Sequence, residues 1–78
     1  MTSVKELSGR ERAMLRAVAA GRGRLSGEPV LYVDGLRCCD QMAAHDLVDA
    51  GLLRPGHAVG LEECAAAVLT EAGRAAIA

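Results

Sequence analysis

The 78-residue sequence contains no tryptophan and no phenylalanine, and Tyr32 is its only aromatic residue. Fifteen alanines account for much of its 51% apolar content. A core made of leucine, valine, methionine and alanine is thin, and a chain of this length is close to the lower size limit for independent folding. We expect one domain spanning 1–78, and homodimerisation is one way in which such a domain could gain stability.

Long apolar segments are also missing. No stretch approaches the roughly 20 apolar residues that a membrane-spanning helix requires. The N-terminal residues lack the apolar run of a signal peptide, which predicts a cytoplasmic protein with no membrane partner. The abundance of alanine, glycine and arginine is typical of a GC-rich bacterial genome.

The sequence has no excess of positive charge, because 9 basic and 10 acidic residues give a net charge of −1. The charges are unevenly distributed. Residues 1–37 hold seven basic and four acidic residues, whereas residues 38–78 hold two basic and six acidic ones. This asymmetry permits a local basic face on a nearly neutral protein.

Three cysteines, Cys38, Cys39 and Cys64, are present, but there is no Cys-x-x-Cys spacing. With His45 and His57 they would suffice in number for a tetrahedral zinc site, although their spacing does not favour one. Adjacent residues 38 and 39 would point to opposite faces if both lay in a strand. An odd cysteine count argues against a disulfide framework. We therefore expect free thiols, no metal and no cofactor.

Signals for catalysis are missing as well. The sequence has no glycine-rich phosphate loop and no paired-carboxylate motif, and so small a core leaves little volume for a substrate pocket. A cysteine, a histidine and an aspartate are present at Cys39, His45 and Asp49, but on one short helix their side chains would not converge on a substrate. The sequence predicts a protein without enzymatic activity.

Local signals in the first half predict a helix followed by a hairpin. Ser8 and Glu11 have the spacing of a capping box, which predicts a helix over 8–20 that ends at Gly21. Residues 21–28 are expected to form a flexible, basic connection. The Asp-Gly pair at 34–35 lies between two apolar runs and predicts a hairpin with strands at about 30–33 and 36–39.

The second half predicts a helix, a second hairpin and a short final helix. Asp40 is a suitable N-cap for a helix running to about residue 50, where Gly51 ends it. Strands are expected to begin at 52 and to return over 65–69, with a short piece near 59–61. Thr70 caps a last helix over 71–77, which Gly73 is expected to weaken. The predicted class is therefore a small α+β domain.

Two segments of this half, HDLVDAGLLR at 45–54 and AVLTEAGRA at 67–75, resemble the recognition helix and wing of a winged helix-turn-helix domain, with a MarR/PadR-like wing pattern. The resemblance covers about half the chain. It implies a winged-helix-like fold in the order helix, hairpin, helix, wing hairpin, short helix, and a DNA-binding transcriptional regulator. A standard member has another helix before the recognition helix. Here the hairpin around Asp34 takes that place, so the chain resembles a variant that lacks the standard second helix.

The resemblance places helix 40–50 in a major groove of double-stranded DNA, with Gln41 and His45 near base edges. Basic residues in the connection, in the hairpin and at the wing are expected to contact phosphates; these are Arg22, Arg24, Arg37, Arg54 and His57.

The charges of the same helix allow a second interpretation. Asp40, Asp46 and Asp49 lie along it, and there is no lysine or arginine between residues 38 and 53. Phosphate contacts supply much of the affinity of DNA-binding proteins and require such cations. The alternative is a protein–protein interaction module that presents an acidic helix to a partner, with its arginines in ordinary surface ion pairs.

Overall fold

The structure, a computed structural model, describes residues 7–78 and confirms an α+β fold. The N-terminal residues 1–6, on which the expectation about a signal peptide rests, lie outside the described residues. The elements in chain order are α1 (Gly9–Ala19), β1 (Gly23–Ser26), β2 (Leu31–Val33), β3 (Leu36–Arg37), α2 (Gln41–Asp49), β4 (Leu53–Pro55), β5 (Cys64–Leu69) and α3 (Glu71–Ala76).

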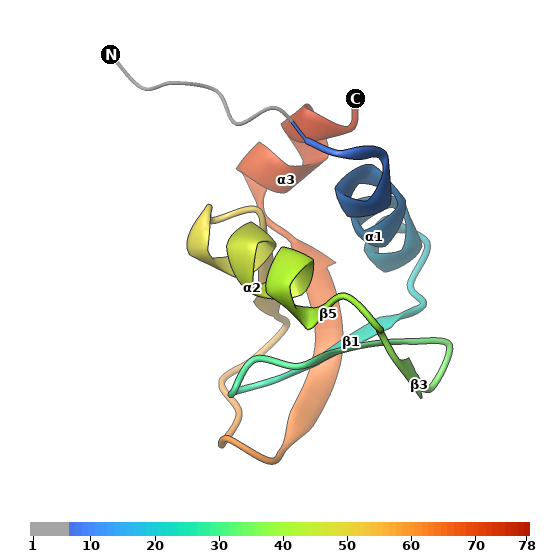
Figure 1. Ribbon diagram of the computed structural model, residues 1–78. Coiled ribbons are helices and arrows are strands. Elements are labelled where there is room, and N and C mark those ends of the chain that lie inside the picture. Colours follow the sequence, from blue (N-terminus) through green and yellow to red (C-terminus); the bar gives the residue numbers. More distant parts are fainter. Residues whose placement is uncertain (1–6) are drawn as a thin grey trace.

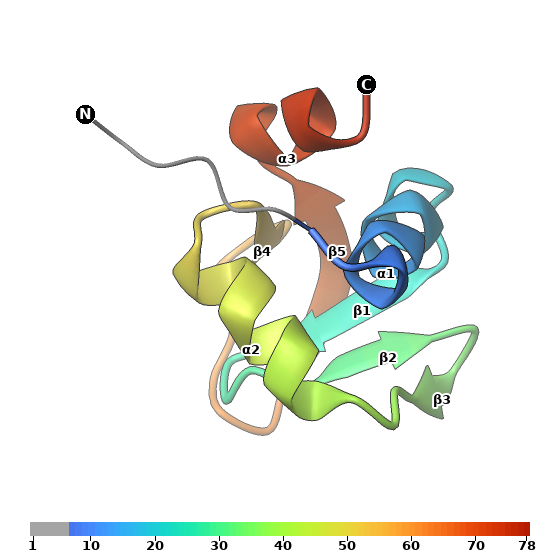
Figure 2. The same ribbon diagram turned by 45° about the horizontal axis from the view of Figure 1, so that its top comes forward.

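The five strands form one antiparallel sheet in the order β3-β2-β1-β5-β4. Strand β1 is central, with Leu25 opposite Leu31 of β2 on one side and opposite Ala65 of β5 on the other. Helices α1 and α2 lie in front of this sheet, and α3 follows the end of β5 (Figures 1 and 2).

The core lies between the helices and the sheet face that they cover. Its fully buried large side chains are leucines from α1, from three strands and from α2, namely Leu15, Leu25, Leu31, Leu47 and Leu53. Alanines 65 and 67 of β5 are also buried, and their small size allows the helices to approach the sheet closely. An aliphatic core without aromatic rings is what the composition predicts.

Local signals explain where the elements begin and end. The Ser8 hydroxyl accepts a hydrogen bond from the Glu11 amide at 3.1 Å, and the Glu11 carboxylate accepts one from the Ser8 amide at 3.0 Å, so the capping box is confirmed. Asp34 and Gly35 both have positive φ, at 54° and 79°, as a type I′ hairpin turn requires. Gly51, which follows the C-cap residue Ala50 of α2, has a φ of 75°, and a left-handed residue at this position ends the helix.

Three expectations about the strands are wrong. Residues 23–26 are the central strand β1 and not part of a flexible connection. The second strand of the first hairpin ends at Arg37 and does not continue to residue 39. No strand forms at 59–61. Strand β1 has poor intrinsic strand propensity, and its hydrogen bonds to β2 and β5 supply what the local sequence does not.

Even α1, the longest helix within residues 7–78, has only 11 residues and cannot span a bilayer.

Candidate functional site

The outward face of α2 is acidic. Met42, His45, Asp46 and Asp49 follow one another at helical spacing and are all exposed. Met42 is the most unusual of them, because 73% of this large apolar side chain is exposed. The face therefore combines two carboxylates, one imidazole and one thioether, and it offers no lysine or arginine to a phosphate.

Gln41 does not belong to this outward face, contrary to our expectation. Its side-chain amide donates to the carbonyl oxygens of Leu31 at 3.1 Å and Cys38 at 2.6 Å, and its oxygen accepts from the Leu31 amide at 3.0 Å. These bonds attach the first residue of α2 to the β2–β3 hairpin. The amide that we expected to bind a base is thus engaged with the backbone.

Asp40 connects the start of α2 to α1. One carboxylate oxygen accepts from the Ala43 amide at 3.0 Å, which caps the helix, and the other accepts from the Arg10 guanidinium at 3.0 Å. The amide hydrogen bond, followed by the bond to Arg10, lowers the pKa of Asp40 below its ordinary value of 3.8. Both interactions favour the charged carboxylate.

This lowered pKa predicts a pH dependence of stability. A carboxyl group whose pKa falls on folding stabilises the protein above its ordinary pKa, and the contribution disappears as the pH drops through the folded-state value. Wild-type protein should therefore lose stability relative to Asp40→Asn as the pH falls from about 6 to about 2. Urea unfolding of both proteins across that range measures the effect, and parallel curves would contradict it.

Three of the predicted phosphate-binding arginines lie together on the sheet face that the helices leave uncovered. Arg24 and Arg54 each adjoin a buried leucine in their strand, so their side chains point away from the core. Arg37 is paired with Tyr32, which follows the buried Leu31 and so also points outward. We call this the open face; its strand residues are Arg24, Tyr32, Arg37, Arg54, Cys64, Ala66 and Val68.

Tyr32 lies between two of these arginines in one cross-strand row. It is opposite Arg37 on one side and Arg24 on the other. With about 4.8 Å between neighbouring strands, the Cα atoms of the two arginines are about 10 Å apart. A shallow hollow of about 220 Å³ is lined by Arg24, Tyr32, Gly35 and Cys64.

The open face carries no acidic residue in its strands, and among residues 7–78 none of its three arginines forms an ion pair. Arg24 and Arg54 donate to backbone carbonyl oxygens, of Cys64 at 3.2 Å and Pro55 at 3.3 Å. These hydrogen bonds leave the positive charges unneutralised. The open face is thus a small basic surface on a protein whose net charge is −1.

The basic residues are not grouped around α2, contrary to our expectation. The open face is opposite the side that α2 covers, so Arg24, Arg37 and Arg54 do not flank that helix. Arg22 forms an ion pair with Asp34 at 2.8 Å. His57 is exposed in the β4–β5 connection, where its Nδ1 contacts the Ala58 carbonyl oxygen at 3.1 Å.

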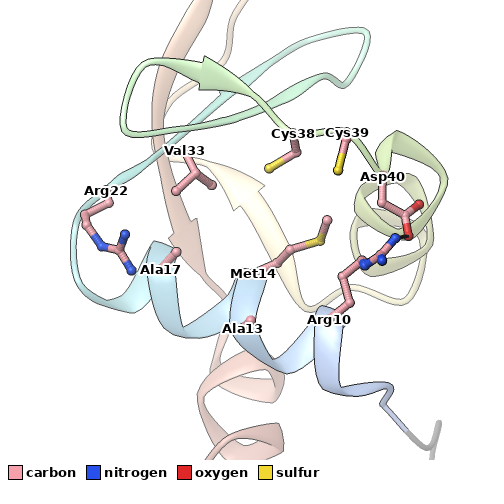
Figure 3. A pocket seen from close by; sticks show the side chains of 9 residues that line it. All are labelled: Arg10, Ala13, Met14, Ala17, Arg22, Val33, Cys38, Cys39 and Asp40. Carbon is pink, nitrogen blue, oxygen red and sulfur yellow. Dashed lines mark hydrogen bonds and ion pairs between the residues drawn. The ribbon is translucent and has the colours of Figure 1, made fainter.

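A cleft of about 380 Å³ lies between α1, the β2–β3 hairpin and the start of α2, lined by the nine residues labelled in Figure 3. Its floor contains Met14, and Cys38 and Cys39 both border it. Desolvation, followed by the neighbouring Cys39, raises the pKa of the Cys38 thiol. We call this the thiol cleft.

The two cysteines do not alternate as they would in a strand, because β3 ends at Arg37. Cys64 lies elsewhere, on the open face, and all three cysteines are free thiols. Within residues 7–78, no group of three or more His, Cys, Asp or Glu side chains is placed to hold a metal ion.

No family model, curated protein or solved structure matches the chain.

Proposed function

We propose that the chain is a nucleic-acid-binding protein on a winged-helix-like scaffold, and that the open face of its sheet provides the binding surface. The observation that carries the proposal is the grouping of Arg24, Arg37 and Arg54 on one face without a strand carboxylate. In the scaffold that the sequence resembles, α2 followed by β4 and β5 is the helix-and-wing unit. The acidic face of α2 makes it a poor phosphate ligand, so the proposal places the nucleic acid on the sheet.

Electrostatics favours an anionic ligand on this face. Arg24 and Arg37 flank one tyrosine at positions about 10 Å apart, and neither has a carboxylate partner among the described residues. Their like charges repel each other until an anion neutralises them. A phosphodiester backbone supplies a row of such anions, and guanidinium groups bind phosphates through paired hydrogen bonds.

Tyr32 favours a single strand over a duplex. Its half-buried ring borders the hollow beside Arg24. Aromatic side chains on open sheets stack against unpaired bases, whereas the bases of a duplex are stacked on one another and unavailable. In this proposal a base stacks on Tyr32, and Arg24 and Arg37 bind phosphates on either side of it.

A titration of a fluorescently labelled single strand, followed by anisotropy from low to physiological salt, tests the proposal. Binding should weaken steeply as salt rises, because each phosphate contact releases counterions. The double variant Arg24→Gln/Arg37→Gln should bind more weakly and reduce the salt slope by about 2, or about 1 for each lost contact.

The matched control is Arg12→Gln/Arg16→Gln, which removes the same charge from exposed positions of α1. It should retain nearly all binding. Tyr32→Leu should weaken the single strand more than a duplex of the same sequence. Equal losses in both double variants would show attraction to overall charge and would overturn the assignment of the open face.

A second candidate function rests on the exposed face of α2. Met42, 73% exposed, is followed at helical spacing by Asp46 and Asp49, which suits a basic protein partner with an apolar contact. The titration separates the two candidates. If no nucleic acid binds even at low salt, nucleic-acid binding fails and the α2 face becomes the leading interaction surface.

A further inference from the structure

Three sulfur-containing side chains from two separate parts of the chain line the thiol cleft. Cys38 and Cys39 come from the segment between β3 and α2, and Met14 comes from α1. Figure 3 shows the sulfur atoms of both cysteines directed into the cleft, with the Met14 thioether extending toward them from the floor. The early end of β3 makes this possible, since a continuing strand would have turned one cysteine away.

The exposed fractions of these side chains suit a site that is formed before a ligand binds and that a ligand can reach from the solvent. Met14 is only 7% exposed, so packing fixes its position, whereas Cys38 is half-buried and Cys39 is exposed. The Arg10–Asp40 ion pair joins α1 to the residue that directly follows Cys39. The two halves of the site are therefore held together without a bound ligand.

We propose that the thiol cleft binds one copper(I) ion through the sulfur atoms of Cys38, Cys39 and Met14. Thiolate and thioether sulfur are soft ligands, and copper(I) is among the metals that soft ligands favour. Copper(I) is satisfied by two or three sulfur ligands, so the cleft needs no fourth side chain. The two thiols release their protons to the solvent on binding, and the copper remains in its +1 state.

The same ligand set does not suit zinc. Structural zinc sites are almost always four-coordinate, with cysteine, histidine or carboxylate ligands. Only Cys38 and Cys39 among the cleft residues qualify, because the Asp40 carboxylate is already engaged with the Ala43 amide and Arg10. A thioether is a poor ligand for zinc and a good one for copper(I).

The test is an anaerobic competition between the reduced protein and bicinchoninate, a coloured copper(I) chelator, with copper(I) as the added metal. Wild-type protein should remove one equivalent of copper from the chelator. Loss of an outer-shell partner alone costs about 10- to 100-fold in metal affinity, so Cys38→Ser or Cys39→Ser, which removes a ligand, should cost about 100-fold or more. Met14→Leu, which preserves apolar volume, should cost less, about 10-fold.

Cys64→Ser is the matched control, because its thiol lies on the open face, outside the thiol cleft. It should bind copper(I) as the wild type does. Circular dichroism of each variant confirms that it folds, and Cys38→Ala replaces Cys38→Ser if the serine variant does not.

Failure of the wild type to compete, or an equal loss in Cys64→Ser, would overturn the proposal. An unchanged affinity in Met14→Leu would remove the thioether from the site and overturn the three-sulfur assignment. None of these results bears on the proposed nucleic-acid binding, which involves other residues.

Discussion

Replacing Leu25 with alanine is expected to lower the free energy of unfolding by about 2–5 kcal/mol, the usual range for a buried leucine. Leu25 is fully buried in β1, between β2 and β5. The deletion opens a cavity where the central strand meets the helices. Total stability should be about 4–12 kcal/mol for a domain of 78 residues, so this single change removes a large share of it. Urea unfolding followed by circular dichroism measures the loss.

Leu61→Ala is the matched control for this experiment. Leu61 is 69% exposed in the connection between β4 and β5. The same truncation there should change the stability by no more than about 0.5 kcal/mol. If Leu25→Ala were equally mild, segment 23–26 would have to be the exposed connection that its sequence suggests and not the central strand.

Comparing α1 with β1 shows which parts of this fold the sequence predicts. The capping box of Ser8 and Glu11 and the turn at Asp34–Gly35 were predictable because each depends on residues within a few positions of one another. Strand β1 depends on partners far along the chain, since Arg24 is paired with Ala66. Its sequence, Gly-Arg-Leu-Ser, has the composition of a turn. A β-carbon on Gly23 would lie 2.7 Å from Cγ2 of Val18, so glycine allows β1 to approach α1 this closely without a shift of that side chain.

The candidate sites also combine features that the local sequence predicts with features that depend on distant parts of the chain. The sequence shows that Arg24, Arg37 and Arg54 are basic, but their gathering on one face depends on the register of all five strands. The sequence predicts a flexible connection at 23–26 that could bring Arg24 beside α2, but these residues form β1, the central strand of the sheet. Gln41 lies on the side of α2 that faces the hairpin, and no sequence signal predicts its hydrogen bonds to the backbone of Leu31.

Gly73→Ala is expected to destabilise the protein by about 1–3 kcal/mol, the usual cost of overpacking. Inside a helix alanine is ordinarily better than glycine by about 1 kcal/mol, so the sequence alone predicts the opposite sign. Here a β-carbon on Gly73 would collide with the carbonyl oxygen of Leu52. That carbonyl already accepts a hydrogen bond from the Thr70 amide at 3.1 Å. Thermal and urea unfolding of the wild type and the variant show directly whether the substitution lowers or raises the stability.

Gly9→Ala provides the comparison, because Gly9 is also helical but a β-carbon there meets nothing within 4 Å. It should be neutral or stabilising by up to about 1 kcal/mol. The collision at Gly73 would push α3 away from the turn after α2, where the Thr70 hydroxyl donates to the Gly51 carbonyl oxygen at 2.6 Å. Gly73 is therefore not a weak point of α3 but the residue that lets its first turn lie directly on the Leu52 carbonyl. A stabilised Gly73→Ala protein would show that α3 does not pack this closely.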